Sequence, residues 1–167
     1  MAIVNDIYGY LYLAEPYTAS RSTSLALKAH PGSRSVGQHE TLQELLDKGL
    51  IDEKDRAVFR VVRNPADWLV THYHHMTSWH SFGFPAFARN FLEARQTIFR
   101  PQYGGVLKYE AINTDLNILL SSLGVPEVKL PWIGITQGKK PYREYYTDDL
   151  KELVLKLTDW EAYGYSW

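Results

Sequence analysis

The chain has 167 residues, of which 45% are hydrophobic and 22% are charged, so it is long enough for one domain, residues 1–167, with a sizeable core. Its 18 basic and 19 acidic residues nearly cancel, which gives no support to a nucleic acid or a membrane surface as a partner. The chain contains no cysteine, which excludes disulfides, thiolate catalysis and cysteine-ligated zinc.

The N-terminal stretch, MAIVNDIYGY, lacks the basic segment that precedes the apolar run of a signal peptide. No apolar stretch elsewhere in the sequence approaches the roughly 20 residues that a membrane helix needs. These two features together predict a soluble, cytoplasmic protein.

Hydrophobic patterns in the first 62 residues predict strands that alternate with helices. In chain order they predict a strand at 8–14, a helix at 22–29, a short strand at 33–37, a helix at 42–48 and a strand at 57–62. Thr41 and Glu44 form a capping-box pattern at the start of the second helix, and Gly49 is placed to end it.

The rest of the chain continues this alternation. Asn64 can cap a helix that has Pro65 at its first position and runs toward Met76. Further on, the patterns predict a helix at 86–95, a strand in GVLKYE (105–110), a helix at 112–123 closed by Gly124, and a last helix capped by Thr147. This order predicts an α/β fold of three layers, with a mainly parallel central sheet flanked by helices. Ligands of such folds bind at the carboxyl ends of the strands.

A loop rich in hydroxyl groups follows the first predicted strand, in the stretch EPYTASRSTSL (15–25). Five hydroxyl side chains surround one arginine, Arg21, and these are Thr18, Ser20, Ser22, Thr23 and Ser24. One interpretation is structural, because Ser and Thr are common in turns and at helix N-caps. The other is an anion site, because a helix N-terminus presents unpaired N–H groups and the positive end of its dipole.

A second polar stretch, FRVVRNPADWLVTHYHHM, spans the end of the strand at 57–62. Arg63 leaves that strand, and Thr71 lies eight positions later (71 − 63), about two helical turns along. The planar guanidinium of Arg63 can hold a phosphate through paired, charge-assisted hydrogen bonds. The alternative is structural, with Arg63 paired to Asp67 or to a nearby backbone carbonyl.

Four stretches, in order from about Tyr8 to Tyr165, resemble the sulfotransferases. PYTASRS (16–22) is similar to the family's turn that holds the 5′-phosphosulfate of the donor, and the segment from Arg63 to Thr71 is similar to its 3′-phosphate-binding segment. KYEAINTDLNILLSSLGVP resembles the family's Tyr-Glu strand and the helix after it, and YREYYTDDLKELVLKLTDWEAYGY resembles the C-terminal segment of carbohydrate-type members. The resemblance implies a P-loop-NTPase-like sulfotransferase fold that binds 3′-phosphoadenosine 5′-phosphosulfate (PAPS) and needs no metal.

The resemblance also implies which residues bind PAPS and its product, adenosine 3′,5′-bisphosphate (PAP). The residues that would hold the 5′-phosphosulfate are Thr18, Ala19, Ser20, Arg21, Ser22 and Thr23. Arg63 and Thr71 would hold the 3′-phosphate. Lys139 and Lys140, in a late basic loop, would contact the nucleotide, although the two lysines are equally consistent with solvated surface charge.

The loop departs from the family at two positions, since Tyr17 stands where the family has Lys and Ala19 stands where it has Gly. The family's Lys is thought to neutralise charge on the leaving group, and Tyr cannot supply a positive charge at neutral pH. Arg21 is the only cation between Pro16 and Leu25. We therefore expect Arg21 to take over the catalytic role of that Lys.

Sulfuryl transfer also needs a group that takes the proton of the acceptor. His39, in SVGQHETL, follows a predicted strand and is similar in place to a His of the family, which makes it the first candidate base. Glu40 is the second candidate. Either residue can instead cap the helix that follows.

Four histidines in THYHHMTSWH, namely His72, His74, His75 and His80, raise the question of a metal site. No carboxylate accompanies them in this run. We interpret them as surface imidazoles beside a core stripe made of Trp68, Leu69, Tyr73 and Met76.

The patterns and the resemblance together predict an enzyme that transfers a sulfuryl group from PAPS to a hydroxyl of a small molecule or carbohydrate. The alternative is a catalytically weak or inactive member of the fold that binds a nucleotide or another anionic ligand, because Tyr17 replaces Lys. The acceptor region falls at about 78–100, where WHSFGFPAF is consistent with a sugar platform, a dimer contact or core. The chain is short for the family, so a homo-oligomer is one way to complete the acceptor cleft.

Overall fold

The computed structural model describes residues 1–94, 104–158 and 160–167. The chain divides into two compact units. The first consists of Met1–Val62 and Arg100–Gly134, and the second of Arg63–Phe99 and Ile135–Trp167. The first boundary in the chain falls directly after the strand that was predicted at 57–62. That the chain forms one domain, 1–167, stays a prediction.

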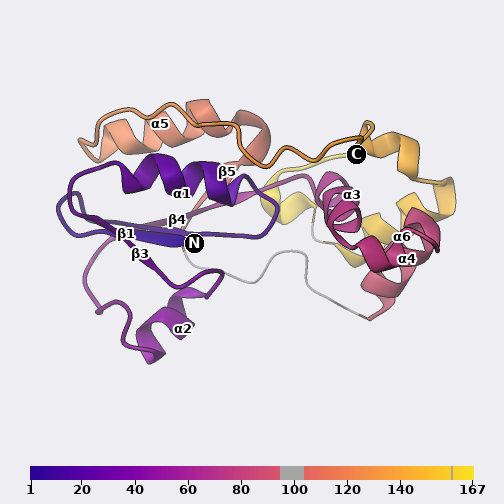
Figure 1. Cartoon of the computed structure of the whole chain (residues 1–167), viewed down its shortest axis with the longest axis horizontal. Coiled ribbons are helices and arrows are strands. Elements are labelled where there is room, and N and C mark those ends of the chain that lie inside the picture. Colours follow the sequence, from indigo (N-terminus) through magenta and orange to yellow (C-terminus); the bar gives the residue numbers. More distant parts are fainter. Residues whose placement is uncertain (95–103, 159) are drawn as a thin grey trace. The chain divides into compact units, whose positions relative to one another are not determined.

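Five short strands form the sheet of the first unit, in the order β3-β1-β2-β4-β5 (Figure 1). They are β1 (Ala2–Asn5), β2 (Tyr10–Leu13), β3 (Ser33–Val36), β4 (Ala57–Val62) and β5 (Gly105–Lys108). The pairs β2–β4 and β4–β5 are parallel, whereas β1 runs antiparallel to both β2 and β3. The sheet is therefore mixed, with two of its four pairings parallel, which corrects the prediction of a mainly parallel sheet.

The strand that the sequence patterns missed is β1. Its four residues, AIVN, are all buried, and a turn that includes Gly9, with a φ of 67°, returns the chain as β2. Strands joined by a tight turn pair in the antiparallel sense, so β1 and β2 form a hairpin in which Val4 lies opposite Leu11. Asn5 and Asp6 end the apolar run MAIV after four residues, which is too short for a periodic signal.

Helices cover both faces of this sheet (Figure 1). Two of them, α1 (Ser20–Lys28) and α5 (Ile112–Ser122), lie on one face, and α2 (Leu42–Asp47) lies on the other. The strand residues alternate accordingly. The face toward α1 and α5 buries Ile3, Tyr10, Tyr12, Phe59, Val61 and Leu107 together with Leu27 and Leu116. The face toward α2 buries Ala2, Val4, Leu11, Leu13 and Val36 together with Leu45. The first unit thus has three layers.

The predicted capping box of α2 is confirmed. The Thr41 hydroxyl accepts a hydrogen bond from the Glu44 N–H at 3.2 Å, and the Glu44 carboxylate accepts one from the Thr41 N–H at 2.7 Å. A 3-10 turn, η2 (Tyr109–Ala111), connects β5 to α5, and Gly124, with a φ of 66°, follows the end of α5. The first helix, α1, begins at Ser20, two residues before its predicted start.

Three helices form most of the second unit, and they are α3 (Pro65–His75), α4 (Gly83–Glu93) and α6 (Asp148–Leu157). Short 3-10 turns lie at η1 (Thr77–Trp79), η3 (Tyr142–Tyr145) and η4 (Glu161–Tyr163). As predicted, Pro65 opens α3, and the Asn64 side chain caps it by accepting from the N–H groups of Ala66 and Asp67 at 3.0 and 3.2 Å. The helix predicted at 86–95 starts earlier, at Gly83, and residue 95 lies outside the described residues.

Aromatic side chains fill the core of the second unit. The rings of Trp68 in α3 and Phe91 in α4 lie 5.7 Å apart. Phe84 and Phe87, both from WHSFGFPAF, are buried, whereas Phe82 of the same stretch is 69% exposed. The core interpretation of this stretch is therefore confirmed for Phe84 and Phe87. Within the described ranges, no helix has the length and apolar character to cross a membrane.

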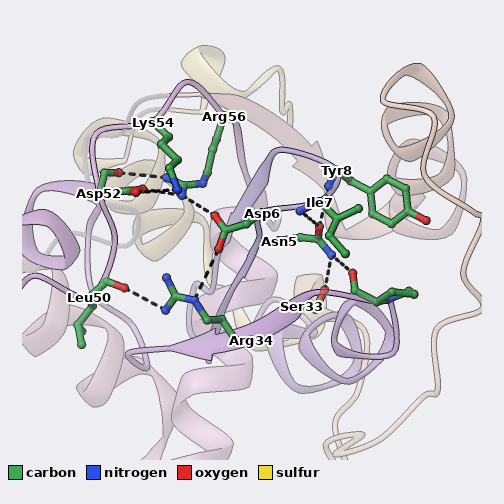
Figure 2. Close-up of polar contacts among 11 residues, drawn as sticks. Asn5, Asp6, Ile7, Tyr8, Ser33, Arg34, Leu50, Asp52, Lys54 and Arg56 are labelled. Atoms are coloured by element: carbon green, nitrogen blue, oxygen red, sulfur yellow. Dashed lines mark hydrogen bonds and ion pairs between the residues drawn. The ribbon is translucent and has the colours of Figure 1, made fainter.

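Asn5, the last residue of β1, organises the turn into β2 (Figure 2). Its Nδ2 donates to the Pro31 carbonyl at 2.9 Å and to Ser33 Oγ at 2.8 Å. Its Oδ1 accepts from the N–H groups of Ile7 and Tyr8 at 3.0 and 2.8 Å. Asn5 itself is fully buried, so its amide has these four hydrogen bonds in place of contacts with water.

An ion-pair network lies beside this turn (Figure 2). The Arg56 guanidinium, with a side chain only 4% exposed, is 2.6 Å from carboxylate oxygens of both Asp6 and Asp52. Asp6 also pairs with Arg34 at 3.8 Å, and Asp52 pairs with Lys54 at 2.9 Å. The network joins the β1–β2 turn to β3 and to the segment before β4.

We predict that Asn5→Ala lowers the free energy of unfolding by about 2 to 4 kcal/mol, because the side chain's hydrogen bonds to Ile7, Tyr8, Pro31 and Ser33 are lost. Denaturant titration followed by circular dichroism measures the loss. The control is Asn113→Ala, on the exposed side of α5, which should change stability by less than about 0.5 kcal/mol. Similar small effects of both substitutions would contradict the structural role of Asn5.

Candidate functional site

The hydroxyl side chains predicted to surround Arg21 are buried, with Thr18 in the segment between β2 and α1 and the other four in α1. Those at most 9% exposed are Thr18, Ser20, Ser22, Thr23 and Ser24. The Thr18 hydroxyl donates to the Glu15 carbonyl at 2.9 Å, and the Thr23 hydroxyl donates to the Ala19 carbonyl at 3.1 Å. These hydroxyls therefore hold the backbone of the loop and the first turn of α1 in place, as the structural interpretation expects.

Two residues of this loop, Tyr17 (φ 60°) and Ala19 (φ 59°), have left-handed backbone conformations. Among the described residues, no other non-glycine residue has a positive φ. Such a conformation costs a residue with a Cβ roughly 1 to 2 kcal/mol. Ala19 is the N-cap of α1 and offers no side-chain cap. Loops of this kind can point successive N–H groups toward one side and form a concave anion site at a helix N-terminus.

The cation of the loop, Arg21, lies in the first turn of α1 with an exposed side chain. Its guanidinium forms no hydrogen bond or ion pair within residues 1–94, 104–158 and 160–167. The segment at Ile133 and Gly134 passes beside it, since the Ile133 N–H donates to Ser22 Oγ at 3.3 Å and a Cβ at Gly134 would lie 3.6 Å from the guanidinium. Burial raises the pKa of Tyr17, so its phenol is neutral at pH 7 and cannot supply a positive charge.

Arg60 and Glu15 form a buried ion pair that was not predicted from the sequence. Arg60 NH1 and Glu15 Oε1 are 3.4 Å apart, and both side chains are less than 10% exposed. Arg60 lies opposite Leu13 in the parallel pairing of β4 with β2, two residues before Glu15. An arginine inside an apolar strand such as AVFRVV needs a charged partner when buried. That requirement was the signal in the sequence that could have identified the pair.

The two candidate bases lie in the segment before α2 and differ in their surroundings. His39 Nδ1 is 2.8 Å from the Ala14 carbonyl, so Nδ1 carries the proton and Nε2 is the basic nitrogen of the neutral ring. The Glu40 carboxylate accepts hydrogen bonds from the Gln38 N–H and from Lys48 Nζ, the latter at 3.0 Å. The bond from Gln38, followed by the bond from Lys48, lowers the pKa of Glu40 to about 2. A carboxylate with that pKa is a weak base at pH 7.

Three residues predicted to bind the nucleotide converge in the second unit, around Asp67 of α3. Arg63 contacts Asp67 Oδ2 through Nε at 2.7 Å and through NH2 at 2.6 Å. Lys139 Nζ lies 2.5 Å from Asp67 Oδ1 and donates to Thr71 Oγ1 at 3.1 Å. The Thr71 hydroxyl donates to the backbone carbonyl of Asp67 at 2.9 Å. We call Arg63, Asp67, Thr71 and Lys139 the α3 cluster.

The α3 cluster is largely buried and carries a positive charge. The side chains of Arg63, Asp67 and Lys139 are 10%, 17% and 13% exposed, and Thr71 is 3% exposed. Two cations and one carboxylate give the three ionised groups a net charge of +1 (2 − 1). The pairing of Arg63 with Asp67 agrees with the structural interpretation of Arg63. The structure does not bring Lys140 into the cluster, because its side chain is 71% exposed and its Nζ lies 4.0 Å from the Glu144 carboxylate.

The four histidines of THYHHMTSWH do not act as one group. His72 packs between Phe87 and Phe91, with ring centroids 5.4 and 5.3 Å away, and His74 Nε2 lies 2.8 Å from the Tyr145 hydroxyl. Burial lowers the pKa of both imidazoles. The described residues include no group of three or more metal-ligating side chains.

No protein-family model, curated protein or solved structure matches this chain.

We predict that Ala19→Gly raises the free energy of unfolding by roughly 0.5 to 1 kcal/mol, because glycine adopts a positive φ without the steric cost that Ala19 bears. Thermal unfolding measures the change. The matched control is Ala29→Gly at the end of α1, where φ is −71°, and here the same substitution should destabilise. Destabilisation by both substitutions would contradict the left-handed conformation of Ala19.

Proposed function

We propose that the protein is a sulfotransferase that moves a sulfuryl group from PAPS to a hydroxyl of a small molecule or carbohydrate. The observation that carries this proposal is the α3 cluster. Arg63, Thr71 and Lys139 come from two distant stretches of the chain, and the sequence predicts a nucleotide-binding role for each. Within the second unit Arg63 and Lys139 both contact Asp67, and Lys139 also donates to Thr71.

The α3 cluster suits a phosphate monoester. Arg63 offers a planar set of donors, Lys139 a point charge and Thr71 a hydroxyl. A phosphate monoester carries close to two negative charges at pH 7. Charge-assisted hydrogen bonds to it contribute on the order of 1.5 to 3 kcal/mol each, less the cost of weakening the contacts with Asp67. This is the chemistry that a 3′-phosphate requires.

The loop of the first unit suits the 5′-phosphosulfate. Its anion-binding parts would be the backbone N–H groups around Thr18, Ala19 and Ser20 and the positive end of the α1 dipole. Ser22 and Thr23 would line the same turn. The exposed guanidinium of Arg21 would stabilise the charge that develops on the leaving phosphate.

Transfer itself forms one bond and breaks one. An oxygen of the acceptor attacks the sulfur, the bond from sulfur to the bridging oxygen of the 5′-phosphate breaks, and PAP leaves with the electron pair. The proton of the acceptor hydroxyl would pass to His39 Nε2, because Nδ1 is held by the Ala14 carbonyl. Glu40 is the weaker candidate, since its pKa is lowered to about 2. The acceptor region at 78–100 is described only to residue 94, and 95–100 lie outside the described residues.

A second candidate function is binding without transfer, with the protein as a catalytically weak or inactive sulfotransferase-like protein that holds a nucleotide or another anionic ligand. The observation that favours it is the neutral, half-buried Tyr17 at the position where a Lys is expected. PAP binding in the absence of sulfuryl transfer to any of a broad panel of hydroxyl acceptors would select this alternative.

We predict that the protein binds PAP at least tenfold more tightly than adenosine 5′-monophosphate, a difference of about 1.4 kcal/mol. The reason is that only PAP carries the 3′-phosphate that the α3 cluster would hold. Arg63→Ala should remove most of this preference, and Thr71→Val should reduce it less, because only a neutral hydroxyl is lost. Calorimetric titration of both nucleotides into each protein measures the preference.

The control for this experiment is Arg89→Ala, which removes an exposed arginine of α4 that pairs with Asp149. Its preference for PAP should match that of the unmodified protein. Circular dichroism spectra establish that each variant is folded. Equal affinity of the unmodified protein for the two nucleotides would overturn the proposed sulfotransferase function.

We predict that Arg21→Ala and His39→Ala each lower the turnover of sulfuryl transfer by at least tenfold while PAP affinity changes less than threefold, because both groups would act mainly in the transition state. Transfer of labelled sulfate from PAPS to acceptors measures turnover. Arg34→Ala, at an exposed position of β3, serves as the control for loss of a positive charge. Full turnover in a folded Arg21→Ala variant would exclude Arg21 from catalysis, and the same result for His39→Ala would exclude His39.

A further inference from the structure

The Asp67 carboxylate occupies the centre of the α3 cluster. Its Oδ2 faces both Nε and NH2 of Arg63, and its Oδ1 faces Lys139 Nζ, all within 2.7 Å. Both carboxylate oxygens of Asp67 therefore contact cationic side chains. The donors that Asp67 engages are the same groups that a phosphate would need.

We propose that Asp67 is an internal competitor for the phosphate, a carboxylate that neutralises Arg63 and Lys139 and yields these donors when a phosphate monoester binds. This inference rests on the phosphate site of the proposed function and adds a residue that sets its affinity. Asp67 thereby weakens the binding that its neighbours provide.

The direction of the effect follows from the charges. With Asp67 ionised, the cluster presents a net charge of +1 to an incoming dianion, and without that charge it would present +2. A like charge within a few ångströms of a bound phosphate is repulsive, and the low exposure of the cluster leaves little water to screen it. The loss of the carboxylate charge should therefore strengthen phosphate binding.

A further polar group near Asp67, the Tyr146 hydroxyl, does not change this charge balance. The Tyr146 hydroxyl donates to the Ala66 carbonyl at 3.0 Å, beside Asp67 in α3. Burial, and next to it the charge of Asp67, raise the pKa of Tyr146 well above its ordinary value. The phenol is thus neutral, and Arg63 and Lys139 supply the charge that faces the carboxylate.

Lys139 can turn its N–H donors from Asp67 to a phosphate by rotation of its own side chain. Its side chain reaches both Asp67 Oδ1 and Thr71 Oγ1, and it is a flexible four-carbon chain with three rotatable donors. When Lys139 turns to a phosphate oxygen, Thr71 Oγ1 regains an acceptor position. Thr71 can then give up its bond to the Asp67 carbonyl, a bond of the kind that serine and threonine make within helices, and donate to the phosphate.

The test is Asp67→Asn, which keeps the shape of the side chain and removes its charge. We expect this variant to bind PAP about tenfold more tightly than the unmodified protein, the equivalent of about 1.4 kcal/mol. Adenosine 5′-monophosphate should bind both proteins within about twofold, because it has no 3′-phosphate. Calorimetric titration of the two nucleotides into the full chain gives both ratios. The matched control is Glu144→Gln, which removes an exposed carboxylate near Lys140 in the same unit and should leave PAP affinity unchanged.

A stability measurement separates competition from simple loss of an ion pair. Asp67→Asn leaves two buried cations without their carboxylate, so its midpoint of thermal unfolding should fall. Saturating PAP should raise that midpoint more in Asp67→Asn than in the unmodified protein, because a ligand that binds the folded state more tightly stabilises it more. A purely structural role of Asp67 would lower the midpoint without this larger recovery.

A second pair of variants, built on Lys139→Gln, keeps the proposal testable if Asp67→Asn does not fold. Lys139→Gln removes one of the two cations, and the double variant Lys139→Gln with Asp67→Asn leaves Arg63 as the single charge of the cluster. The double variant should bind PAP more tightly than Lys139→Gln alone, again by several-fold. This pair of proteins applies the same substitution at Asp67 in a cluster that has one cation fewer.

The outcomes distinguish this inference from the proposed function. PAP affinity that is unchanged or weaker in Asp67→Asn, with a preference for PAP over adenosine 5′-monophosphate retained, would overturn the role of Asp67 and leave the phosphate site standing. Equal tightening in Glu144→Gln would reduce the effect to overall charge and also overturn it. Equal affinity for the two nucleotides in both the unmodified protein and Asp67→Asn would overturn the phosphate site itself.

Discussion

A buried cation needs an anion, and this constraint organises the polar centre of each unit. Moving a guanidinium or ammonium group out of water costs several kcal/mol unless a negative partner compensates. In the first unit Arg60 has Glu15, one cation for one carboxylate. In the second unit Arg63 and Lys139 share Asp67, two cations for one carboxylate. The first arrangement pairs one cation with one carboxylate, whereas in the second one carboxylate is shared between two cations.

The two arrangements also differ in what they hold. Glu15 opens the loop after β2, so its bond to Arg60 fixes the place where the strand ends and the loop begins. Asp67 lies in the first turn of α3, and its bond to Lys139 ties the segment after Ile135 to that helix. A pair of one cation and one carboxylate suits a fixed structural contact. A carboxylate shared by two cations suits the exchange that we propose for phosphate binding.

Most of the fold could be predicted from the sequence because its signals are local. The capping box at Thr41 and the Asn64-Pro65 start of α3 depend on side chains within four residues of each other, and both are confirmed. The relative orientation of the strands does not depend on local signals. It depends on β1, whose three leading apolar residues gave no periodic pattern, and whose antiparallel pairing with two neighbours makes the sheet mixed.

The candidate site was predictable to the same degree. Arg63 precedes α3 and Thr71 lies about two helical turns after it, so both come close to Asp67, which is four positions from each. Lys139 was assigned to the nucleotide without a geometric reason, because no local pattern links residue 139 to α3. The pair of Glu15 and Arg60 was missed for the opposite reason. Arg60 lies in an apolar strand, and its partner Glu15 is brought close only by the parallel pairing of β4 with β2, which no local pattern indicates.

The loop after β2 combines the two interpretations that its sequence left open. Its hydroxyls serve the backbone, since Thr18 and Thr23 donate to backbone carbonyls, and that service is what a strained loop requires. Among the described residues, Tyr17 and Ala19 are the two non-glycine residues with a positive φ. A residue with a Cβ keeps such a conformation only when its surroundings fix it. The structural role of the hydroxyls would therefore support the anion binding that we propose for the loop, because N–H groups held rigidly in place lose less entropy when an anion binds.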